Sequence, residues 1–459
     1  MTHFSPRHLL TKSVIRLLLA GILPAAVVAA LFSTGVVGAA GGSSAPRLSA
    51  SNASAKLNGH WVGTWTAAPQ LTEPANMPPP PFTGTNVVFA NSTLRQTLHV
   101  SVGGRQIRLR FSNAYGGADL PITMVSVARP VGGQAGVSAI QAGTSRPVTF
   151  DGRSAIYIPV GAQMVSDPLD FPVATGTNLT VTIYLSAGQA STSITSHPGS
   201  RTNSYMVTGN HVNDQDLPGA TSVAHWYFLS GAEISTSGPT AAVAVIGDSL
   251  TDGRGSTTNG NDRWTDQLFN RLQSSRVAAN VAVLNQGLGG NRVLHDGLGP
   301  NVLARLDRDV LAQSGVKWLV VFEGVNDIGT ADATDAAQKQ VTADLIAAFQ
   351  QIITRAHALG IRVYGATITP FGGNTMYDDP QGLRAASRAA VNEWIRTSRQ
   401  FDAVLDFDKA ARDPANPGQI LPAFDSGDHL HLNPAGYGAL AAAVPPGLFT
   451  QAGDELGFQ

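Results

Sequence analysis

The sequence predicts an all-β sandwich or jelly roll followed by an α/β domain with a doubly wound parallel sheet. Two patterns indicate these classes. Apolar and polar residues alternate in much of residues 59–236, as in half-buried antiparallel strands. From residue 240 to 450, short apolar runs alternate with helix-length segments, an order typical of a parallel sheet. The chain of 459 residues has room for both domains.

The composition excludes several classes of function. Apolar residues make up 43% of the chain and charged residues 13%, which is typical of an ordered globular protein. The net charge is -1, so no basic field attracts phosphate backbones, and we expect no nucleic-acid partner. The chain has no cysteine, which excludes disulfides, a cysteine nucleophile and thiolate metal sites.

Residues 1–40 have the order of a secretory signal peptide. Arg7, Lys12 and Arg16 precede the apolar run 17–32, and small residues follow up to Ala40. The alternative is a retained membrane anchor, because residues 17–40 are long enough to span a bilayer. Either segment implies function outside the cytoplasm, and we expect no obligate membrane partner. The small, polar residues 41–58 predict a linker.

Within the β domain, residues 59–236, three alternating segments are clearest. They are Leu98/Val100/Val102, Ile107/Leu109/Phe111 and Leu179/Val181/Ile183/Leu185. Gly103 and Gly104 separate the first two segments, and two glycines suit the positive φ angles of a two-residue hairpin turn. The sequence therefore predicts a hairpin at this point.

The α/β domain, residues 240–450, follows Gly238-Pro239. Five apolar runs predict its strands, at 241–246, 281–284, 318–322, 361–366 and 404–407. Between them, apolar residues three or four positions apart, such as Trp264, Leu268 and Leu272, predict helices. Loops at the carboxyl ends of such strands converge on one crevice, so polar residues in these loops are candidates for a site.

Four of these loops carry the candidate residues. They are Gly247-Asp248-Ser249-Leu250, Gly287-Leu288-Gly289-Gly290, Gly324-Val325-Asn326-Asp327 and Asp428-His429-Leu430-His431. A serine hydroxyl becomes a good nucleophile when an imidazole accepts its proton and a carboxylate orients the imidazole. Ser249, His431 and Asp428 fit these three roles.

The same loops supply groups that stabilise an oxyanion. A tetrahedral intermediate needs N–H donors about 3 Å from its oxyanion. The backbone N–H groups of Ser249 and Gly290 and the side-chain amide of Asn326 fit this role. Asp248 is interpreted as a supporting residue that holds the turn around Ser249 by hydrogen bonds.

The four segments, in this order and after these strands, resemble the sequence blocks of the SGNH or GDSL hydrolases. The resemblance covers residues 240–450 and implies a flavodoxin-like fold, Ser249 as nucleophile, Gly290 and Asn326 as oxyanion residues, and the acid Asp428 three positions before the base His431. With its β domain, the chain is similar to secreted bacterial arylesterases and polysaccharide deacetylases. This implies an acyl or acetyl ester substrate, small or linked to a polysaccharide, and no metal or cofactor.

Two departures from the family pattern leave alternatives open. Val325 stands where glycine is common, and His429 is an additional imidazole beside the expected base. Asp425 is a second candidate for the acid, and Asp428, His429 and His431 also have the chemistry of metal ligands. The loops 251–263 and 370–379 are expected to flank the site.

We therefore expect a secreted serine esterase that forms an acyl-enzyme. One alternative is a carbohydrate-binding surface protein whose hydrolase domain is vestigial. Another is an acyltransferase that delivers the acyl group to a sugar hydroxyl. A histidine base predicts that kcat/KM rises with pH near the ordinary imidazole pKa of about 6.5.

Overall fold

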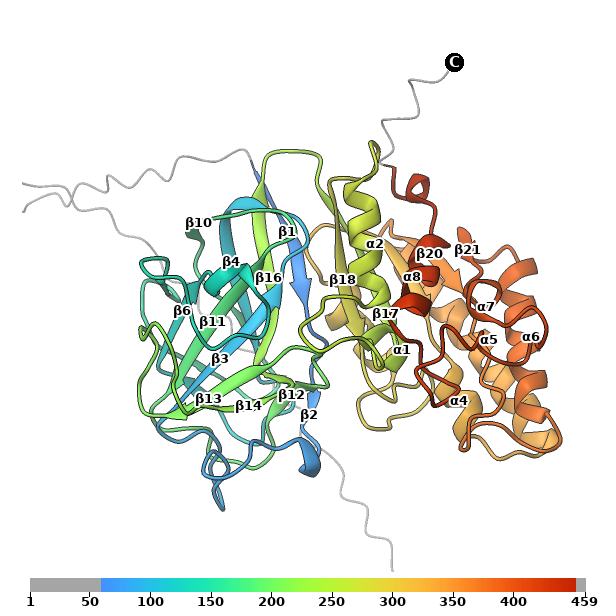
Figure 1. The fold of residues 1–459 in the computed structure, drawn as a ribbon, viewed down its shortest axis with the longest axis horizontal. Coiled ribbons are helices and arrows are strands. Elements are labelled where there is room, and N and C mark those ends of the chain that lie inside the picture. Colours follow the sequence, from blue (N-terminus) through green and yellow to red (C-terminus); the bar gives the residue numbers. More distant parts are fainter. Residues whose placement is uncertain (1–58, 451–459) are drawn as a thin grey trace, which may run out of the picture. The chain divides into compact units, whose positions relative to one another are not determined.

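The computed structural model describes residues 59–450, which lie in one compact unit. The predicted signal peptide and the predicted linker lie outside the described residues. Among residues 59–450, no helix is long and apolar enough to span a membrane. The strands change from antiparallel to parallel between Thr236 and Ala241, as Figure 1 lets the reader follow.

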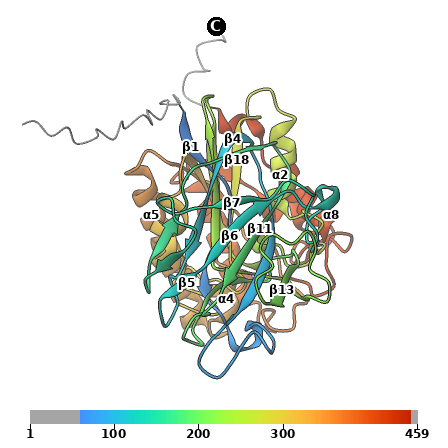
Figure 2. The ribbon, with the colours of Figure 1, turned by 90° about the vertical axis from the view of Figure 1, so that its left-hand side faces the viewer.

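The region before Thr236 consists of antiparallel strands. One sheet has the order β1-β16-β4-β10, with β9 also paired to β4, and a second has the order β14-β13-β3-β11-β6-β7. Figure 2 looks onto the second sheet. The strands of the first are β1 (His60–Thr66), β4 (Gly104–Ser112), β9 (Gln163–Val165), β10 (Leu169–Val173) and β16 (Leu229–Thr236). Those of the second are β3 (Ser92–His99), β6 (Met124–Ala128), β7 (Arg146–Val148), β11 (Asn178–Leu185), β13 (Ser204–Thr208) and β14 (Thr221–Val223).

Both sheets contribute side chains to one hydrophobic cluster. It contains Leu109 and Phe111 from β4 together with Leu94 from β3 and Ile183 from β11. Smaller pairings complete the region: β2 (Gln70–Leu71), β12 (Thr195–Pro198) and β15 (His225–Tyr227) form one sheet, and β5 (Leu120–Ile122) pairs with β8 (Ile156–Ile158). The short helices η1 (Pro74–Asn76) and η2 (Val131–Gly133) lie in its loops. The prediction of a strand-rich antiparallel region is therefore confirmed.

The alternation in β11 predicts one buried and one exposed face. Leu179, Val181 and Ile183 are at most 1% exposed, as predicted. The opposite face is also buried, because Thr182 accepts a hydrogen bond from Arg95 Nε at 3.0 Å and Arg95 itself is fully buried. Arg95 also donates to the carbonyl oxygens of Ser138 and Asp214, so loop segments cover this face.

The hairpin predicted at Gly103-Gly104 is wrong. β3 pairs with β11 and β13, whereas β4 pairs with β16, β10 and β9 in the other sheet. Neither glycine has the positive φ that a two-residue hairpin turn requires. Gly103 instead lies against the backbone after β10, where an added Cβ would stand 2.3 Å from the carbonyl oxygen of Val173. The glycine thus permits a close backbone approach as the chain crosses between sheets.

The region after Ala241 contains the predicted parallel sheet. Its order is β18-β17-β19-β20-β21, in which the second strand precedes the first, and all neighbours are parallel. This is the order of the flavodoxin-like doubly wound sheet. The strands are β17 (Ala241–Gly247), β18 (Val281–Gly287), β19 (Val316–Phe322), β20 (Arg362–Ala366) and β21 (Ala403–Leu405). The first four predicted runs form strands whose apolar side chains are nearly all buried in the core. The fifth, 404–407, only overlaps a strand: Val404 is 38% exposed, and the strand ends at Leu405, before a helix that begins at Phe407.

Helices connect and cover these strands. α2 packs against α8, and α5 packs against α6 (Figure 1). The helices are α1 (Ser249–Asp252), α2 (Trp264–Gln273), α3 (Val302–Leu306), α4 (Val325–Thr330), α5 (Asp335–His357), α6 (Leu383–Thr397), α7 (Phe407–Ala411) and α8 (Pro434–Ala442), with η3 (Asp307–Leu311) and η4 (Pro446–Phe449). The apolar stripe predicted from Trp264, Leu268 and Leu272 is the buried face of α2.

The two regions share part of their core. One hydrophobic cluster contains the strands of the parallel sheet together with three residues of the antiparallel region. These are Val62 of β1, Val102 between β3 and β4, and Ile234 of β16. The backbone N–H of Gly63 also donates to the carbonyl oxygen of Ser314 at 2.9 Å. The antiparallel region therefore packs directly against the parallel sheet.

Candidate active site

Ser249 lies at the carboxyl end of the first parallel strand, at the start of the one-turn helix α1. The Asp248 side chain caps this helix by accepting a hydrogen bond from the Leu250 N–H at 2.8 Å. Gly247 allows the tight turn, because an added Cβ would lie 2.1 Å from Thr251 Oγ1. Gly253, with a φ of 99°, ends the helix. This turn holds the Ser249 hydroxyl at the carboxyl edge of the sheet.

A chain of hydrogen bonds links Ser249, His431 and Asp428. Ser249 Oγ lies 2.8 Å from His431 Nε2, and His431 Nδ1 lies 2.6 Å from Asp428 Oδ2. The Asp428 side chain also accepts a hydrogen bond from the His431 backbone N–H at 2.8 Å. Burial acts to raise the pKa of Asp428, but the hydrogen bonds from His431 outweigh it and hold this pKa well below its usual value. Asp428 is therefore a carboxylate at every pH at which an imidazole is neutral.

The additional residues of this loop lie apart from Ser249. His429 Nδ1 contacts Asp425 Oδ2 at 2.6 Å, and the His429 side chain is 56% exposed. The backbone of His429 has a φ of 59°, so neighbouring side chains of this loop point in different directions. Of the two imidazoles, the structure brings His431 to Ser249, and Asp425 contacts the other one. Within residues 59–450, no three His, Asp or Glu side chains are grouped as a metal site requires.

The three residues that carry the predicted oxyanion groups, Ser249, Gly290 and Asn326, line one cavity. Gly290 has a φ of 66°, in the region that favours glycine. Asn326 Nδ2 donates to the Asn291 carbonyl oxygen at 2.8 Å, and Asn326 Oδ1 accepts from the Tyr377 hydroxyl at 2.6 Å. These two bonds fix the amide and leave its second N–H for a ligand. Among the described residues, nothing accepts a hydrogen bond from the backbone N–H of Ser249 or of Gly290.

Two loops were expected to flank the site, and they do so to different extents. Residues 373–377 of the second loop line the cavity, whereas of residues 251–263 only Asp252 and Arg254 do. Asn374 Nδ2 donates to the Asp428 carbonyl oxygen at 2.8 Å, which ties the second loop to the loop that carries the base. Arg254 Nε lies 4.0 Å from Asp428 Oδ2 at the cavity rim.

The cavity has a volume of about 940 Å³, and the antiparallel region forms part of its wall. No sequence pattern predicts this wall. Its residues are Gln70, Glu73, Asn76, Pro198, Gly199, Arg201 and His225. Burial and the nearby His197 lower the pKa of His225, and the neutral ring accepts the Gly199 N–H through Nδ1 at 3.0 Å. Its other nitrogen, Nε2, therefore carries the ring proton.

Buried ionisable side chains lie next to the strand ends that carry the site. Arg305 donates to the carbonyl oxygens of Gly247 and Gln286, at the ends of β17 and β18. Glu323 lies 3.8 Å from Arg305, is fully buried, and has no hydrogen-bond partner for either carboxyl oxygen among the described residues. Burial, followed by the charge of Asp248, raises the pKa of Glu323 well above its usual value. Burial likewise raises the pKa of Asp248.

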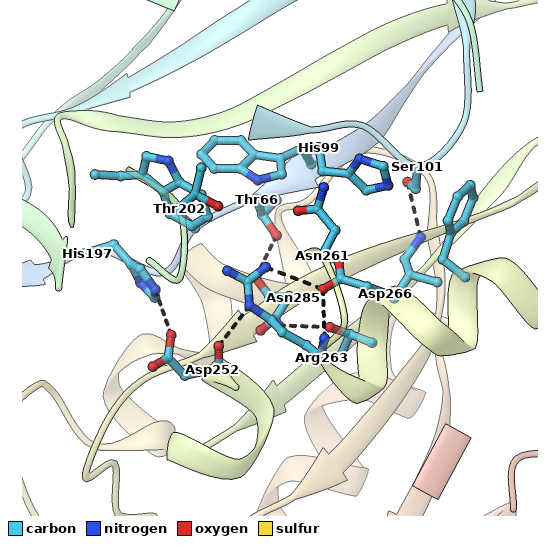
Figure 3. Close-up of a pocket in the computed structure, with 16 residues that line it drawn as sticks. Thr66, His99, Ser101, His197, Thr202, Asp252, Asn261, Arg263, Asp266 and Asn285 are labelled. Carbon is cyan, nitrogen blue, oxygen red and sulfur yellow. Dashed lines mark hydrogen bonds and ion pairs between the residues drawn. The ribbon is translucent and has the colours of Figure 1, made fainter. Parts of the chain in front are cut away.

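Asp252, the last residue of α1, contacts the antiparallel region. It also lines a second, small cavity of about 40 Å³ (Figure 3). His197 Nε2 lies 2.9 Å from Asp252 Oδ1, and Arg201 Nη2 lies 3.3 Å from Asp252 Oδ2. Arg263 Nε donates to the Asp252 carbonyl oxygen at 2.9 Å. Asp252 lines both cavities, so these contacts reach from the small cavity to the site around Ser249.

The fold and this site define a class of protein. A serine hydroxyl in contact with an imidazole, a carboxylate on the far ring nitrogen and free N–H groups nearby have the arrangement of a serine hydrolase. Residues 245–439 match the model of the GDSL-like lipase/acylhydrolase family. This domain belongs to that family, which confirms the resemblance given by its four sequence blocks, and it is a carboxylic ester hydrolase.

Two solved structures are similar to part of this chain. A G-D-S-L family protein from Desulfitobacterium hafniense DCB-2 has 21% identity and a TM-score of 0.34, over 44% of this chain and 97% of that chain. A catalytic mutant of an acetylxylan esterase from Geobacillus stearothermophilus has 19% identity and a TM-score of 0.33, over 48% of this chain and 95% of that chain. No curated protein matches the chain.

Proposed function

We propose that this protein is a secreted serine esterase that removes acyl groups, acetyl above all, from polyhydroxylated alcohols such as carbohydrates. Ser249 is the nucleophile, His431 the base and Asp428 the acid that orients it. The observation that carries the proposal is the 2.8 Å contact between Ser249 Oγ and His431 Nε2, within a cavity that also presents the oxyanion donors. Export rests on the signal-peptide pattern of residues 1–40.

The reaction follows from this arrangement. His431 Nε2 takes the proton of the Ser249 hydroxyl as its oxygen attacks the ester carbonyl carbon. The N–H groups of Ser249, Gly290 and Asn326 stabilise the oxyanion. The intermediate collapses to an acyl-enzyme, and the imidazolium protonates the departing alcohol. His431 then takes a proton from water, whose oxygen attacks the acyl carbon, and returns this proton to Ser249 as the acid leaves.

The wall from the antiparallel region favours a polar alcohol over a lipid. The Glu73 carboxylate accepts hydrogen bonds from Gln70 Nε2 at 2.7 Å and Asn76 Nδ2 at 2.9 Å. Each carboxyl oxygen accepts one of these hydrogen bonds, which leaves further lone pairs for hydroxyl donors. The neutral ring of His225 adds an N–H donor. The cavity is also much larger than an acetyl group, so it has room for sugar rings beside the ester.

A series of p-nitrophenyl esters, from acetate to long-chain acyl groups, tests the proposal on the mature protein beside Ser249→Ala. We expect activity that is highest on acetate and is lost in the variant, together with release of acetate from acetylated xylo-oligosaccharides. A long-chain optimum would contradict the acetyl preference and indicate a lipase. No hydrolysis by the folded protein would reject the esterase. Acyl transfer to an added sugar at the expense of hydrolysis would identify a transferase instead.

A further inference from the structure

We infer that His197, in the antiparallel region, is a positioning residue for the nucleophile Ser249 and acts through Asp252. The inference rests on the proposed function, because it assigns a role in that reaction to a residue outside the family domain. His197 touches neither Ser249 nor the cavity around it. Its effect on the reaction passes through the four-residue helix α1, which starts with Ser249 and ends with Asp252.

A helix of a single turn has little rigidity of its own, so its orientation depends on the contacts of its ends. At the first end, Asp248 caps the helix. At the other end, the Ser249 carbonyl oxygen accepts the N–H groups of Gly253 and Arg254, both at 2.9 Å. The direction of the Ser249 residue is therefore coupled to the segment that follows Asp252. Whatever fixes Asp252 also fixes the backbone from which the nucleophile projects.

His197 holds the Asp252 side chain from a fixed position. Its Nδ1 lies 2.9 Å from the Ala68 carbonyl oxygen and its Nε2 lies 2.9 Å from Asp252 Oδ1. The ring also lies beside the indole of Trp226, with 5.5 Å between ring centroids. His197 is 5% exposed and Asp252 is 3% exposed, so water does not compete for this contact. Breaking a buried contact of a carboxylate is costly because the charge loses a partner that water does not replace.

Two further side chains contact Asp252: Arg201 from the antiparallel region, and Arg263, which precedes α2 and is labelled in Figure 3. Arg201 Nη2 contacts the second carboxyl oxygen at 3.3 Å. Arg263 donates to the Asp252 carbonyl oxygen and also to the carbonyl oxygen of Ser200. Side chain and backbone of Asp252 are thus both tied to residues 197–201, which belong to the antiparallel region. This region is part of the support of the nucleophile as well as a wall of the cavity.

The two ring contacts of His197 can be separated by substitution. In His197→Gln the amide nitrogen takes the place of Nε2 and can still donate to Asp252. In His197→Asn it takes the place of Nδ1, so the contact with Ala68 is kept and the contact with Asp252 is lost. We expect His197→Asn to lower kcat on p-nitrophenyl acetate about 10- to 100-fold with KM within threefold, because a small misplacement of a reacting group has effects of this size. His197→Gln should keep kcat within about threefold.

His211→Gln is the matched control. His211 contacts the carbonyl oxygen of Thr208 through Nε2 at 3.0 Å and the carboxylate of Asp214 through Nδ1 at 2.7 Å, so this variant also keeps the carbonyl contact and loses the carboxylate contact. His211 lines neither of the two cavities. We expect its kcat to equal that of the wild type. Thermal unfolding of all three variants checks that they are folded at the assay temperature.

The outcomes separate the inference from the proposed function. Selective loss of kcat in His197→Asn, with rescue in His197→Gln, supports the positioning role. Equal losses in the two variants that follow their melting temperatures, or a rise in KM at unchanged kcat, would overturn it and leave a structural contact between regions. A wild-type protein without esterase activity, or a Ser249→Ala variant that retains it, would reject the proposed function and the inference with it.

Discussion

Replacing Asn326 with alanine tests the oxyanion site directly. The amide of Asn326 is one of three N–H groups available at the cavity, and its hydrogen bonds to Asn291 and Tyr377 fix its direction. Loss of one such preorganised donor lowers kcat by about 10²–10³, or about 2.7–4 kcal/mol of transition-state stabilisation. We expect a fall of this size for Asn326→Ala on p-nitrophenyl acetate, with little change in KM.

The same geometry predicts a smaller effect for Tyr377→Phe. This variant keeps the Asn326 donor and removes only the hydroxyl that holds its oxygen at 2.6 Å. One neutral hydrogen bond is worth about 0.5–1.5 kcal/mol, so we expect kcat to fall only about two- to tenfold. Burial raises the pKa of Tyr377 to about 12, so its hydroxyl remains a donor throughout the assay range.

Steady-state kinetics measure the loss of kcat in each variant, and thermal unfolding shows whether the variant is folded. Asn213→Ala is a suitable control, because Asn213 is exposed and far along the chain from the site. The reasoning is refuted if folded Asn326→Ala keeps kcat within threefold of the wild type. It is also refuted if Tyr377→Phe loses more activity than Asn326→Ala, because the hydroxyl would then act on the substrate itself.

Three further predictions concern carboxyl groups. Asp428→Asn should lower kcat on the order of 10⁴-fold by disfavouring the active tautomer of the base. Asp425→Asn changes the contact with the exposed imidazole of His429 but keeps the oxygen that accepts the backbone N–H groups of Gly427 and His429, so it should leave kcat within threefold. The reverse order in steady-state assays would exchange the two roles. Glu73→Gln should lower kcat/KM about tenfold for acetylated xylo-oligosaccharides but not for p-nitrophenyl acetate, with the exposed Glu393→Gln as control; equal effects on both substrates would contradict a role in binding the alcohol. Burial raises the pKa of Glu323. The folded protein therefore keeps a proton on Glu323 that the unfolded chain releases above its ordinary pKa of about 4.3. Because the folded state binds more protons, the free energy of unfolding falls as the pH rises from this value toward the folded-state pKa. Urea unfolding of Glu323→Gln should therefore show its stability rising relative to wild type from pH 4 to 8; a difference independent of pH would contradict this.

Most of the fold of the second region could be predicted from the sequence, because its strands are buried on both sides and appear as continuous apolar runs. The strand assignment also predicts that Ser249, Gly290, Asn326 and His431 lie together, because loops after parallel strands meet at one edge of the sheet. The prediction for the antiparallel region was weaker. Gly103 and Gly104 have the composition of a turn. Gly103 is instead needed for the close approach to the backbone of Val173, which lies far along the chain.

The parts of the site that the sequence did not predict depend on contacts over long separations. His197 and Asp252 are 55 positions apart, and no local pattern distinguishes them from other polar residues. The wall formed by Glu73 and Arg201 likewise exists only because the antiparallel region packs against the parallel sheet. Choosing between His429 and His431 also required coordinates, because the backbone conformation of this loop decides which ring faces Ser249.

The shared core has a consequence for how the molecule unfolds. Val62, Val102 and Ile234 come from the antiparallel region but are buried within the cluster of the parallel sheet. Melting either region alone would expose these apolar side chains to water, which links the two in one cooperative transition. A cut between Thr236 and Ala241, where the strand direction changes, would pass through this cluster. The family domain is therefore expected to aggregate when it is produced without the strands that precede it.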